Sequence, residues 1–310
     1  MIIEINNLVK RYGDLTALNH FNLNVKNGDI LGLLGPNGSG KSTAINCMLS
    51  LLSYDRGEIK LFGEPMAPNR YDLKRRIGIV PQEVAVFEEL TVKDNIDYYC
   101  GLYITDKAAR IQHVDEVIQL VGLEEFIKFT PNKLSGGLKR RLNIACGIVH
   151  KPELIFLDEP TVAVDPQSRN KILDSIKELN AQGATIVYTT HYMEEVELLC
   201  NQIVIIDQGQ VIAEGSKEQL KDMIRNNEKL VLEIPELSQS HIQQIHQLAN
   251  VLEAVHEDNY LTIQTSNTKT TLIELLNYLE QQAVSYGSIR TQEITLNDVF
   301  LEITGKELRD

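Results

Sequence analysis

A glycine-rich stretch that contains a lysine is the part of this sequence best suited to bind phosphate. It runs Gly35-Pro36-Asn37-Gly38-Ser39-Gly40-Lys41-Ser42-Thr43 and fits the pattern G-x-x-x-x-G-K-[ST]. In this pattern backbone N–H groups surround the nucleotide phosphates, the lysine reaches the outer phosphates and the hydroxyl ligates Mg²⁺. A plain glycine-rich surface turn is the alternative. The flanks predict a buried strand over 29–34 and a helix from Thr43, which favours a phosphate-binding loop.

Two adjacent carboxylates, Asp158 and Glu159, directly follow the apolar run 154–157. Because parallel strands end at one edge of a sheet, we expect this pair to lie beside the phosphate loop. Asp158 is then expected to hold Mg²⁺, directly or through water, and Glu159 to polarise the attacking water as a general base. The alternative is that both carboxylates only cap the next turn.

A third element, Leu134-Ser135-Gly136-Gly137, stands at the start of a predicted helix and offers a hydroxyl and backbone N–H groups to an anion. Alone it could be a helix cap or a flexible turn. Placed ahead of the Asp158 strand, it matches the signature motif of the ABC ATPases. Over about residues 1–220 the sequence resembles this family, which implies ATP and Mg²⁺ as cofactors and ATP hydrolysis as the activity.

The resemblance also implies roles for residues that the chemistry alone does not single out. Tyr12 matches the aromatic residue that stacks on adenine, and Gln82 the loop glutamine that meets Mg²⁺ and the attacking water and moves with the helical subdomain. Asp165 lies in 160–166, which resembles the dimer-contact loop, and His191 matches the switch histidine that contacts the γ-phosphate. Two departures are Ala163, where the family usually has glycine, and Leu138, where glutamine is more familiar.

These matches define three sets of candidate residues. The catalytic candidates are Lys41, Gln82, Glu159 and His191. The nucleotide-binding candidates are Tyr12, Gly35, Pro36, Asn37, Gly38, Ser39, Gly40, Lys41, Ser42, Thr43, Ser135, Gly136, Gly137 and Asp165. The candidate metal ligands are Ser42, Gln82 and Asp158.

The elements that must position these residues alternate between strand and helix, as in an α/β parallel sheet. A first strand over 2–9 is expected to end in a turn at 10–14, and further strands are expected at 77–80, 154–157, 185–189 and 203–206. A helical subdomain at about 83–150 interrupts the sheet. The resemblance adds an antiparallel β subdomain, which makes residues 1–222 a P-loop NTPase domain of the ABC ATPase type.

The pattern shifts after this domain, and residues 228–310 form a second predicted domain. Its elements follow the order βαββαβ with one added helix, which predicts a small ferredoxin-like α+β fold. The ending from Ile294 to Lys306 resembles that of ATPases from multidrug-type and daunorubicin-resistance-type exporters. We expect a role in dimerisation or regulation for this domain.

Composition and charge limit the kinds of binding partner and the compartment expected for this protein. The formal net charge of −13 over 310 residues argues against a nucleic-acid partner. The clusters 74–76 and 139–141 are interpreted as solvated helix faces or local anion contacts. Four dispersed cysteines predict buried apolar residues in a reducing compartment and no structural metal. No signal peptide or membrane-spanning run is evident, so we expect a cytoplasmic protein.

The leading hypothesis is therefore the ATPase subunit of an ABC-type membrane exporter, peripheral on the inner face of the membrane. The resemblance implies a head-to-tail pair, most simply a homodimer, or a heterodimer with a homologous ATPase, in which Ser135 and Gly137 act on the partner's nucleotide. An integral-membrane permease is expected to dock near the Gln82 loop and the helical insertion. The alternatives are a soluble ABC ATPase acting in translation or DNA maintenance, and a small-molecule kinase.

Overall fold

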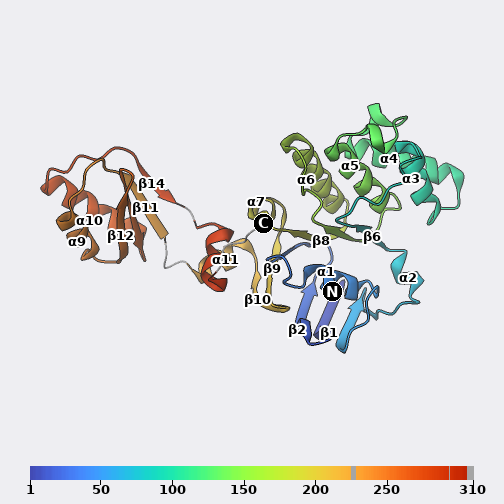
Figure 1. Cartoon of the computed structure of the whole chain (residues 1–310), viewed down its shortest axis with the longest axis horizontal. Coiled ribbons are helices and arrows are strands. Elements are labelled where there is room, and N and C mark those ends of the chain that lie inside the picture. Colours follow the sequence, from blue (N-terminus) through green and yellow to red (C-terminus); the bar gives the residue numbers. More distant parts are fainter. Residues whose placement is uncertain (225–227, 293, 306–310) are drawn as a thin grey trace. The chain divides into compact units, whose positions relative to one another are not determined.

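The computed structural model describes residues 1–224, 228–292 and 294–305 (Figure 1). Residues 306–310 of the predicted C-terminal domain, Lys306 included, lie outside this range. The chain divides into two compact units, one ending at Lys217 and the other beginning at Glu218. The boundaries 222 and 228 remain a prediction.

An antiparallel sheet opens the first unit. Its strands are β1 (Ile3–Tyr12), β2 (Leu15–Val25), β4 (Arg56–Leu61) and β5 (Glu64–Pro65), in the order β2-β1-β4-β5. The prediction that the first strand ends near residue 9 was wrong, because Lys10, Arg11 and Tyr12 still pair with β2. The turn is confined to residues 13 and 14, so Tyr12 lies on a strand end.

The second sheet has six strands in the order β10-β9-β3-β8-β7-β6. They are β3 (Ile30–Leu34), β6 (Ile77–Val80), β7 (Leu154–Asp158), β8 (Thr185–Thr190), β9 (Gln202–Asp207) and β10 (Gln210–Gly215). The five strands from β9 to β6 are parallel, and β10 is antiparallel to β9. Helix α1 (Lys41–Met48) shares one hydrophobic core with both sheets, in which Phe21, Met48 and Phe156 are buried. Burial of this apolar surface fixes the phosphate loop against the sheet edge.

A helical group lies between β6 and β7 in the chain, and its last helix packs against β6 (Figure 1). It contains α3 (Val92–Gly101), α4 (Lys107–Val121), the 3₁₀ turns Glu124–Phe126 and Pro131–Lys133, and α5 (Gly136–Ile148), and the short α2 (Tyr71–Lys74) precedes β6. Thr91, Asp106 and Ser135 cap the three longer helices, since each side chain accepts a hydrogen bond from a backbone N–H of the first turn. Two further helices connect strands of the parallel sheet: α6 (Pro166–Ala181) joins β7 to β8, and α7 (Met193–Leu199) joins β8 to β9.

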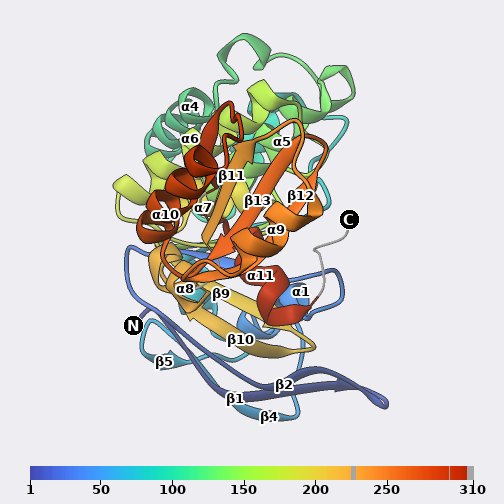
Figure 2. The ribbon, with the colours of Figure 1, turned by 90° about the vertical axis from the view of Figure 1, so that its left-hand side faces the viewer.

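The second unit confirms the predicted ferredoxin-like order. After α8 (Lys217–Met223) come β11 (Glu228–Glu233), α9 (Gln239–His246), β12 (Val251–Glu257), β13 (Tyr260–Thr265), α10 (Thr268–Gln281), β14 (Ile289–Gln292) and α11 (Leu296–Thr304). The strands form an antiparallel sheet in the order β12-β13-β11-β14, with α9 and α10 against it (Figure 2). Leu230, Leu261 and Ile263 of the sheet share a core with Ile245 and Leu275 of the helices.

Two findings about the whole described chain complete the fold. All four cysteines are free and buried, as predicted. Among the described residues, no helix combines the length and the apolar composition that crossing a bilayer would need.

Candidate functional site

Four neighbouring strands of the parallel sheet, β3, β8, β7 and β6, carry the predicted chemistry at their carboxyl ends. The phosphate loop follows β3, and His191 follows β8. Asp158 and Glu159 stand at the end of β7, and Gln82 comes two residues after β6. Because these strands are adjacent and parallel, their ends lie in one row, where α/β sheets bind ligands.

The phosphate loop is closely packed and its lysine is turned inward. A Cβ on Gly35 would lie 2.2 Å from the carbonyl oxygen of Ile206, so only glycine fits there. Lys41 is 6% exposed, and its Nζ donates to the carbonyl oxygens of Gly35 and Pro36 at 2.7 and 3.2 Å. Burial lowers the pKa of Lys41, an effect opposed by Glu159 and then by Asp158. The buried Ser39 Oγ has no hydrogen-bond partner among the described residues.

Asp158 joins the phosphate loop to the sheet. Ser42 Oγ donates to Asp158 Oδ2 at 3.1 Å, and Thr189 Oγ1 donates to Asp158 Oδ1 at 2.6 Å. Thr189 also accepts from the backbone N–H of Glu159 at 2.9 Å. The sequence reasoning missed Thr189, whose place opposite Asp158 follows from the parallel register of β7 and β8.

Glu159 lies between two polar side chains from different strands. Gln82 Nε2 donates to Glu159 Oε2 at 3.0 Å, and His191 Nδ1 lies 3.8 Å from Glu159 Oε1. Glu159 itself is 7% exposed and has a positive φ of 47°, a conformation uncommon for residues other than glycine. A strained backbone thus presents this carboxylate to the groove beside the phosphate loop, the placement a general base needs.

A groove of about 710 Å³ is lined by residues of the phosphate loop together with Gln82, Glu159 and Tyr12. Tyr12 is 46% exposed at the end of β1, with Lys10 Nζ 5.0 Å from the centre of its ring. Because this partly exposed ring lines the groove, it is placed to stack on a base. The groove is also lined by Asn19, Gln208 and Gly209, which the sequence reasoning missed because they come from β2 and from the turn after β9.

The signature residues are placed elsewhere and do not line this groove. Ser135 caps α5, accepting a hydrogen bond from the N–H of Leu138 at 3.3 Å. A Cβ on Gly137 would lie 2.3 Å from Ser168 Oγ, and Asp165 caps α6 by accepting from Ser168 N at 2.9 Å. The start of α5 and the Asp165 loop are thus neighbours within one chain.

The two departures from the family pattern have different structural consequences. Ala163 adopts the left-handed conformation with φ 58°, so the loop has a backbone that favours glycine although the residue is alanine. Leu138 is half-buried in the first turn of α5. Nothing else in the structure distinguishes it.

A buried carboxylate, Glu195 of α7, holds the segment that carries His191. It is 3% exposed, and its Oε2 accepts from the hydroxyls of Thr161, Tyr188 and Thr190 at 2.9, 2.6 and 3.0 Å. Burial, with the nearby Glu195, raises the pKa of Tyr188 well above its usual range, so this phenol stays protonated and donates. These residues were also missed, since no short motif marks them.

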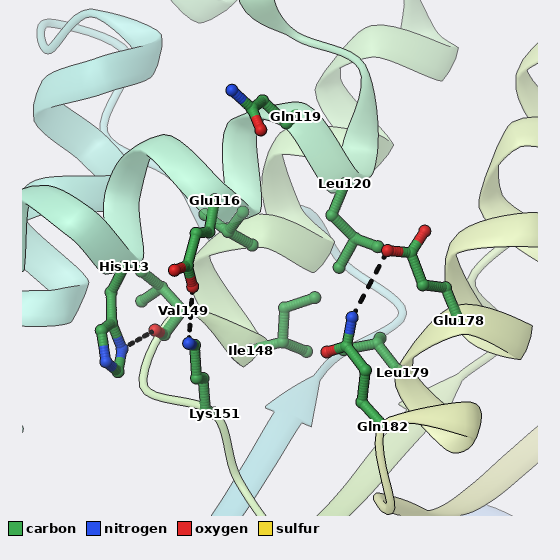
Figure 3. Close-up of a pocket in the computed structure, with 11 residues that line it drawn as sticks. His113, Glu116, Gln119, Leu120, Ile148, Val149, Lys151, Glu178, Leu179 and Gln182 are labelled. Atoms are coloured by element: carbon green, nitrogen blue, oxygen red, sulfur yellow. Dashed lines mark hydrogen bonds and ion pairs between the residues drawn. The ribbon is translucent and has the colours of Figure 1, made fainter.

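A second cavity, of about 410 Å³, lies between α4, the end of α5 and the end of α6 (Figure 3). Several of its polar side chains bond to near neighbours. Glu116 pairs with Lys151 at 2.5 Å, His113 Nδ1 contacts the carbonyl of Val149 at 2.9 Å, and Gln182 donates to Glu178 at 3.3 Å. No predicted site residue lines it, so the groove at the phosphate loop remains the candidate site.

The residues of the groove fit a nucleotide and a hard divalent cation. A buried hydroxyl without a partner and an ammonium bonded to two carbonyls are the groups that a phosphate would complete. A hydroxyl and a carboxylate 3.1 Å apart, Ser42 and Asp158, supply the oxygen donors that Mg²⁺ prefers.

Comparisons with known proteins cover both units. The family model for ABC transporters matches residues 18–162, and the model for the C-terminal domain of DrrA1-3-like ATP-binding proteins matches residues 215–304. The linearmycin resistance ATP-binding protein LnrL of Bacillus subtilis is 38% identical over 100% of both chains. The daunorubicin resistance ATP-binding protein DrrA3 of Streptomyces coeruleorubidus is 30% identical over 99% of this chain and 97% of its own.

Among solved structures, a dimeric ATP-binding cassette in a post-hydrolysis state, bound to ADP and Pi, is 28% identical. It covers 69% of this chain and 98% of its own, with a TM-score of 0.63. The similarity therefore extends to the fold that carries the groove.

Proposed function

Because the chain belongs to the ABC transporter ATP-binding family and is an ATP-hydrolysing subunit of an ABC-type exporter, we propose that it uses Mg²⁺ with ATP, pairs head to tail with a second ATPase subunit and docks on an integral-membrane permease. The observation that carries the proposal is the convergence of Lys41, Asp158, Glu159 and Gln82 at the ends of adjacent strands.

The proposed roles follow from charge and position. Lys41 offsets phosphate charge, and Glu159 takes a proton from the attacking water while Gln82 and His191 hold that water and the γ-phosphate in place. Ser42 and Asp158, with Gln82, hold Mg²⁺, which when bound supplies positive charge to the phosphate oxygens. Tyr12 stacks on the adenine.

The head-to-tail pair is supported by what the groove lacks. Ser135, Gly136 and Gly137 are exposed or packed against the Asp165 loop, away from the phosphate loop of their own chain. A second subunit can bring the same three residues over the nucleotide from outside. The relative solved with ADP and Pi is itself dimeric. A homodimer is the simplest assembly, and a heterodimer with a homologous ATPase has the same geometry.

The permease is proposed to dock on the face that carries the Gln82 loop. Val84 and Phe87 of this loop are 39% and 40% exposed. Tyr98 of the adjoining α3 and Leu102, which directly follows that helix, are 48% and 58% exposed. Beside them lies a groove of about 270 Å³ whose lining includes Ile79 and Tyr103. Exposed apolar side chains gathered around one groove are typical of a protein-binding surface. A permease bound here would contact the loop whose glutamine touches Glu159, and it would hold the subunit at the cytoplasmic face.

Drug resistance is the proposed setting for the exporter, since the relatives named for linearmycin and daunorubicin resistance match nearly the whole chain. These names favour the exporter over a soluble ATPase of translation or DNA maintenance. The absence of a nucleic-acid partner stays a prediction from the net charge of −13.

The pairing is tested with Glu159→Gln, which should hold ATP without hydrolysing it. Size-exclusion chromatography should show the mass of two chains with ATP and of one chain without it. Adding Ser135→Arg should abolish the shift while each chain still binds ATP. A single-chain mass in the presence of bound ATP would contradict the head-to-tail pair.

The docking face is tested with Leu102→Glu in the assembled exporter. Co-purification with the permease from membranes should fall, because a charge replaces an exposed apolar contact. Ile273→Glu, at a similarly exposed position of the second unit (55%), is the matched control. Equal loss of the permease in both variants would argue against this face.

A further inference from the structure

The loop that follows Gln82 is held mainly by the helical group. Asn95 of α3 bonds to the N–H of Phe87 at 2.8 Å and to its carbonyl at 2.9 Å. Tyr99 of the same helix donates to the carbonyl of Ala85 at 2.7 Å. Asn143 of α5 accepts from the N–H of Ala85 at 3.0 Å. The loop is thus attached to α3 and α5, while the Gln82 side chain reaches across to Glu159.

Arg140 of α5 holds the root of this loop. Its Nη1 donates to the carbonyl oxygen of Gln82 at 2.7 Å and to that of Pro81 at 3.2 Å. Asn143, one turn further along α5, adds a bond to the Pro81 carbonyl at 3.2 Å. The backbone on both sides of the Pro81–Gln82 bond is therefore fixed to α5.

Arg140 is an unusual residue to find at this place. It is 7% exposed, and the hydrogen bonds found for it go to carbonyl oxygens and not to a carboxylate. Burial lowers its pKa, while Glu159 acts in the opposite direction, so the guanidinium lies within electrostatic reach of the proposed base. A guanidinium keeps its charge in proteins, and burying one among backbone carbonyls costs free energy.

The same helix begins at the signature. Ser135 caps α5, and Arg140 follows Gly136 by about one turn of helix. Helix α5 therefore links the group proposed to meet the partner's nucleotide with the backbone of the glutamine that touches this chain's own Glu159. A helix of this length moves as a rigid element, so displacement of its start is passed to its first turns.

We propose that Arg140, assisted by Asn143, is a positioning residue that makes the Gln82 side chain follow the signature helix. Docking of Ser135–Gly137 on the partner's nucleotide then sets Gln82 against Glu159 in the same chain. This couples the two ATP sites of a dimer, each formed by the groove of one chain and the signature residues of the other. The proposal rests on the head-to-tail pair for its second half, whereas the dependence of Gln82 on Arg140 stands on contacts within one chain.

Arg141 provides a matched control on the same helix. Its Nη1 also donates to two backbone carbonyls, those of Val121 and Gly122, each at 3.0 Å, but these belong to the end of α4. Arg140→Met and Arg141→Met remove the same kind of interaction from neighbouring positions. Only Arg140→Met removes hydrogen bonds from the backbone carbonyls of Pro81 and Gln82.

The experiment measures kcat and KM for ATP of the full chain in a double-mutant cycle with Gln82→Ala. Arg140→Met should lower kcat by about 10- to 100-fold, as expected for a misplaced catalytic group, with KM for ATP unchanged. It should lower kcat no further in a Gln82→Ala background. Arg141→Met should leave kcat near that of the parent chain in both backgrounds.

Equal losses of kcat in Arg140→Met and Arg141→Met would overturn the proposal, and so would a loss in Arg140→Met that is undiminished by Gln82→Ala. If Arg140→Met does not fold, as judged by its thermal unfolding, Arg140→Lys takes its place. A lysine can bond to one of the two carbonyls and should give a smaller loss of kcat that again disappears with Gln82→Ala. If Glu159→Gln forms no dimer with ATP, the head-to-tail pair is refuted. The kinetic comparison would still test whether Gln82 depends on Arg140.

Discussion

The two side chains beside Glu159 are supported in opposite ways. Gln82 belongs to a loop that α3 and α5 of the helical group hold through Asn95, Arg140 and Asn143. His191 follows β8, whose Tyr188 and Thr190 donate to the buried Glu195 of α7. One support belongs to the helical group, and the other is continuous with the parallel sheet.

This difference suggests a separate task for each neighbour of Glu159: one side fixes the position of the carboxylate, and the other can respond to binding partners. The bonds to Glu195 come from three hydroxyls buried in the core, where they are shielded from water and strengthen one another. Gln82 reaches Glu159 through a single hydrogen bond across two structural groups. We infer that the His191 side is the fixed reference and the Gln82 side the part that responds to partners.

The largest effect on kcat is expected at Glu159, which lies between Gln82 and His191. Glu159→Gln removes the proposed general base and should lower kcat by roughly 10²- to 10⁴-fold, while ATP binding through Lys41 is retained. The measurement is steady-state ATP hydrolysis together with equilibrium binding of ATP. Hydrolysis close to that of the parent chain would show that neither support serves a base at this position.

Tyr188→Phe tests the fixed support. It removes the 2.6 Å bond from a buried phenol to the Glu195 carboxylate, which should cost roughly 1.5 to 3 kcal/mol of the free energy of unfolding. Because the sheet still carries His191, kcat should stay close to that of the parent chain at a temperature where the variant is folded. Urea unfolding and ATP hydrolysis measure the two quantities. A large drop in kcat without a loss of stability would contradict the comparison.

A pH-dependent effect is expected on the movable side, at the end of α5. Burial lowers the pKa of His150 to about 4. Its ring stacks on Tyr103 with centroids 3.8 Å apart, Nε2 donates to the carbonyl of Ile77 at 3.1 Å, and the buried Nδ1 has no hydrogen-bond partner among the described residues. A second proton on this ring would be buried without an acceptor.

The neutral ring therefore favours the folded state at high pH. The stabilisation is complete above the unfolded-state pKa of about 6.5 and is lost progressively as pH falls toward 4. By pH 5 the free energy of unfolding should have fallen by about 2 kcal/mol. His150→Phe, which keeps a ring against Tyr103, should flatten this part of the pH dependence. Urea unfolding at pH 7 and pH 5 measures the difference, and an unchanged slope would show that His150 does not cause it.

The smallest effect is expected in the Asp165 loop. Ala163 has φ 58°, and a left-handed conformation costs an L-residue about 1 to 2 kcal/mol. Glycine avoids this cost but loses more entropy on folding, about 0.5 to 1 kcal/mol. Ala163→Gly should therefore raise the free energy of unfolding by up to about 1.5 kcal/mol, measured by thermal unfolding. A destabilised variant would show that the alanine methyl makes contacts that outweigh the strain.

The sequence alone predicted most of the fold and most of the residues that meet at the groove. The glycine-lysine loop and the strand ending in Asp158 and Glu159 are local patterns, because each needs only a short run of residues with the right periodicity. The ferredoxin-like order of the second unit could also be read in this way. The end of β1 was misplaced because Lys10 and Arg11 look like turn residues until pairing with β2 is known.

Arg140 shows what only the tertiary structure decided. The cluster 139–141 was interpreted as a solvated helix face or an anion contact, which is wrong for Arg140, since it is buried and bonds to the carbonyls of Pro81 and Gln82. Thr189 and Glu195 were likewise missed. The sequence determines which residues can bind phosphate, metal or protons, whereas the side-chain partners of these residues come from strands and helices far apart in the chain. Their meeting depends on strand order and helix packing, which no local pattern contains.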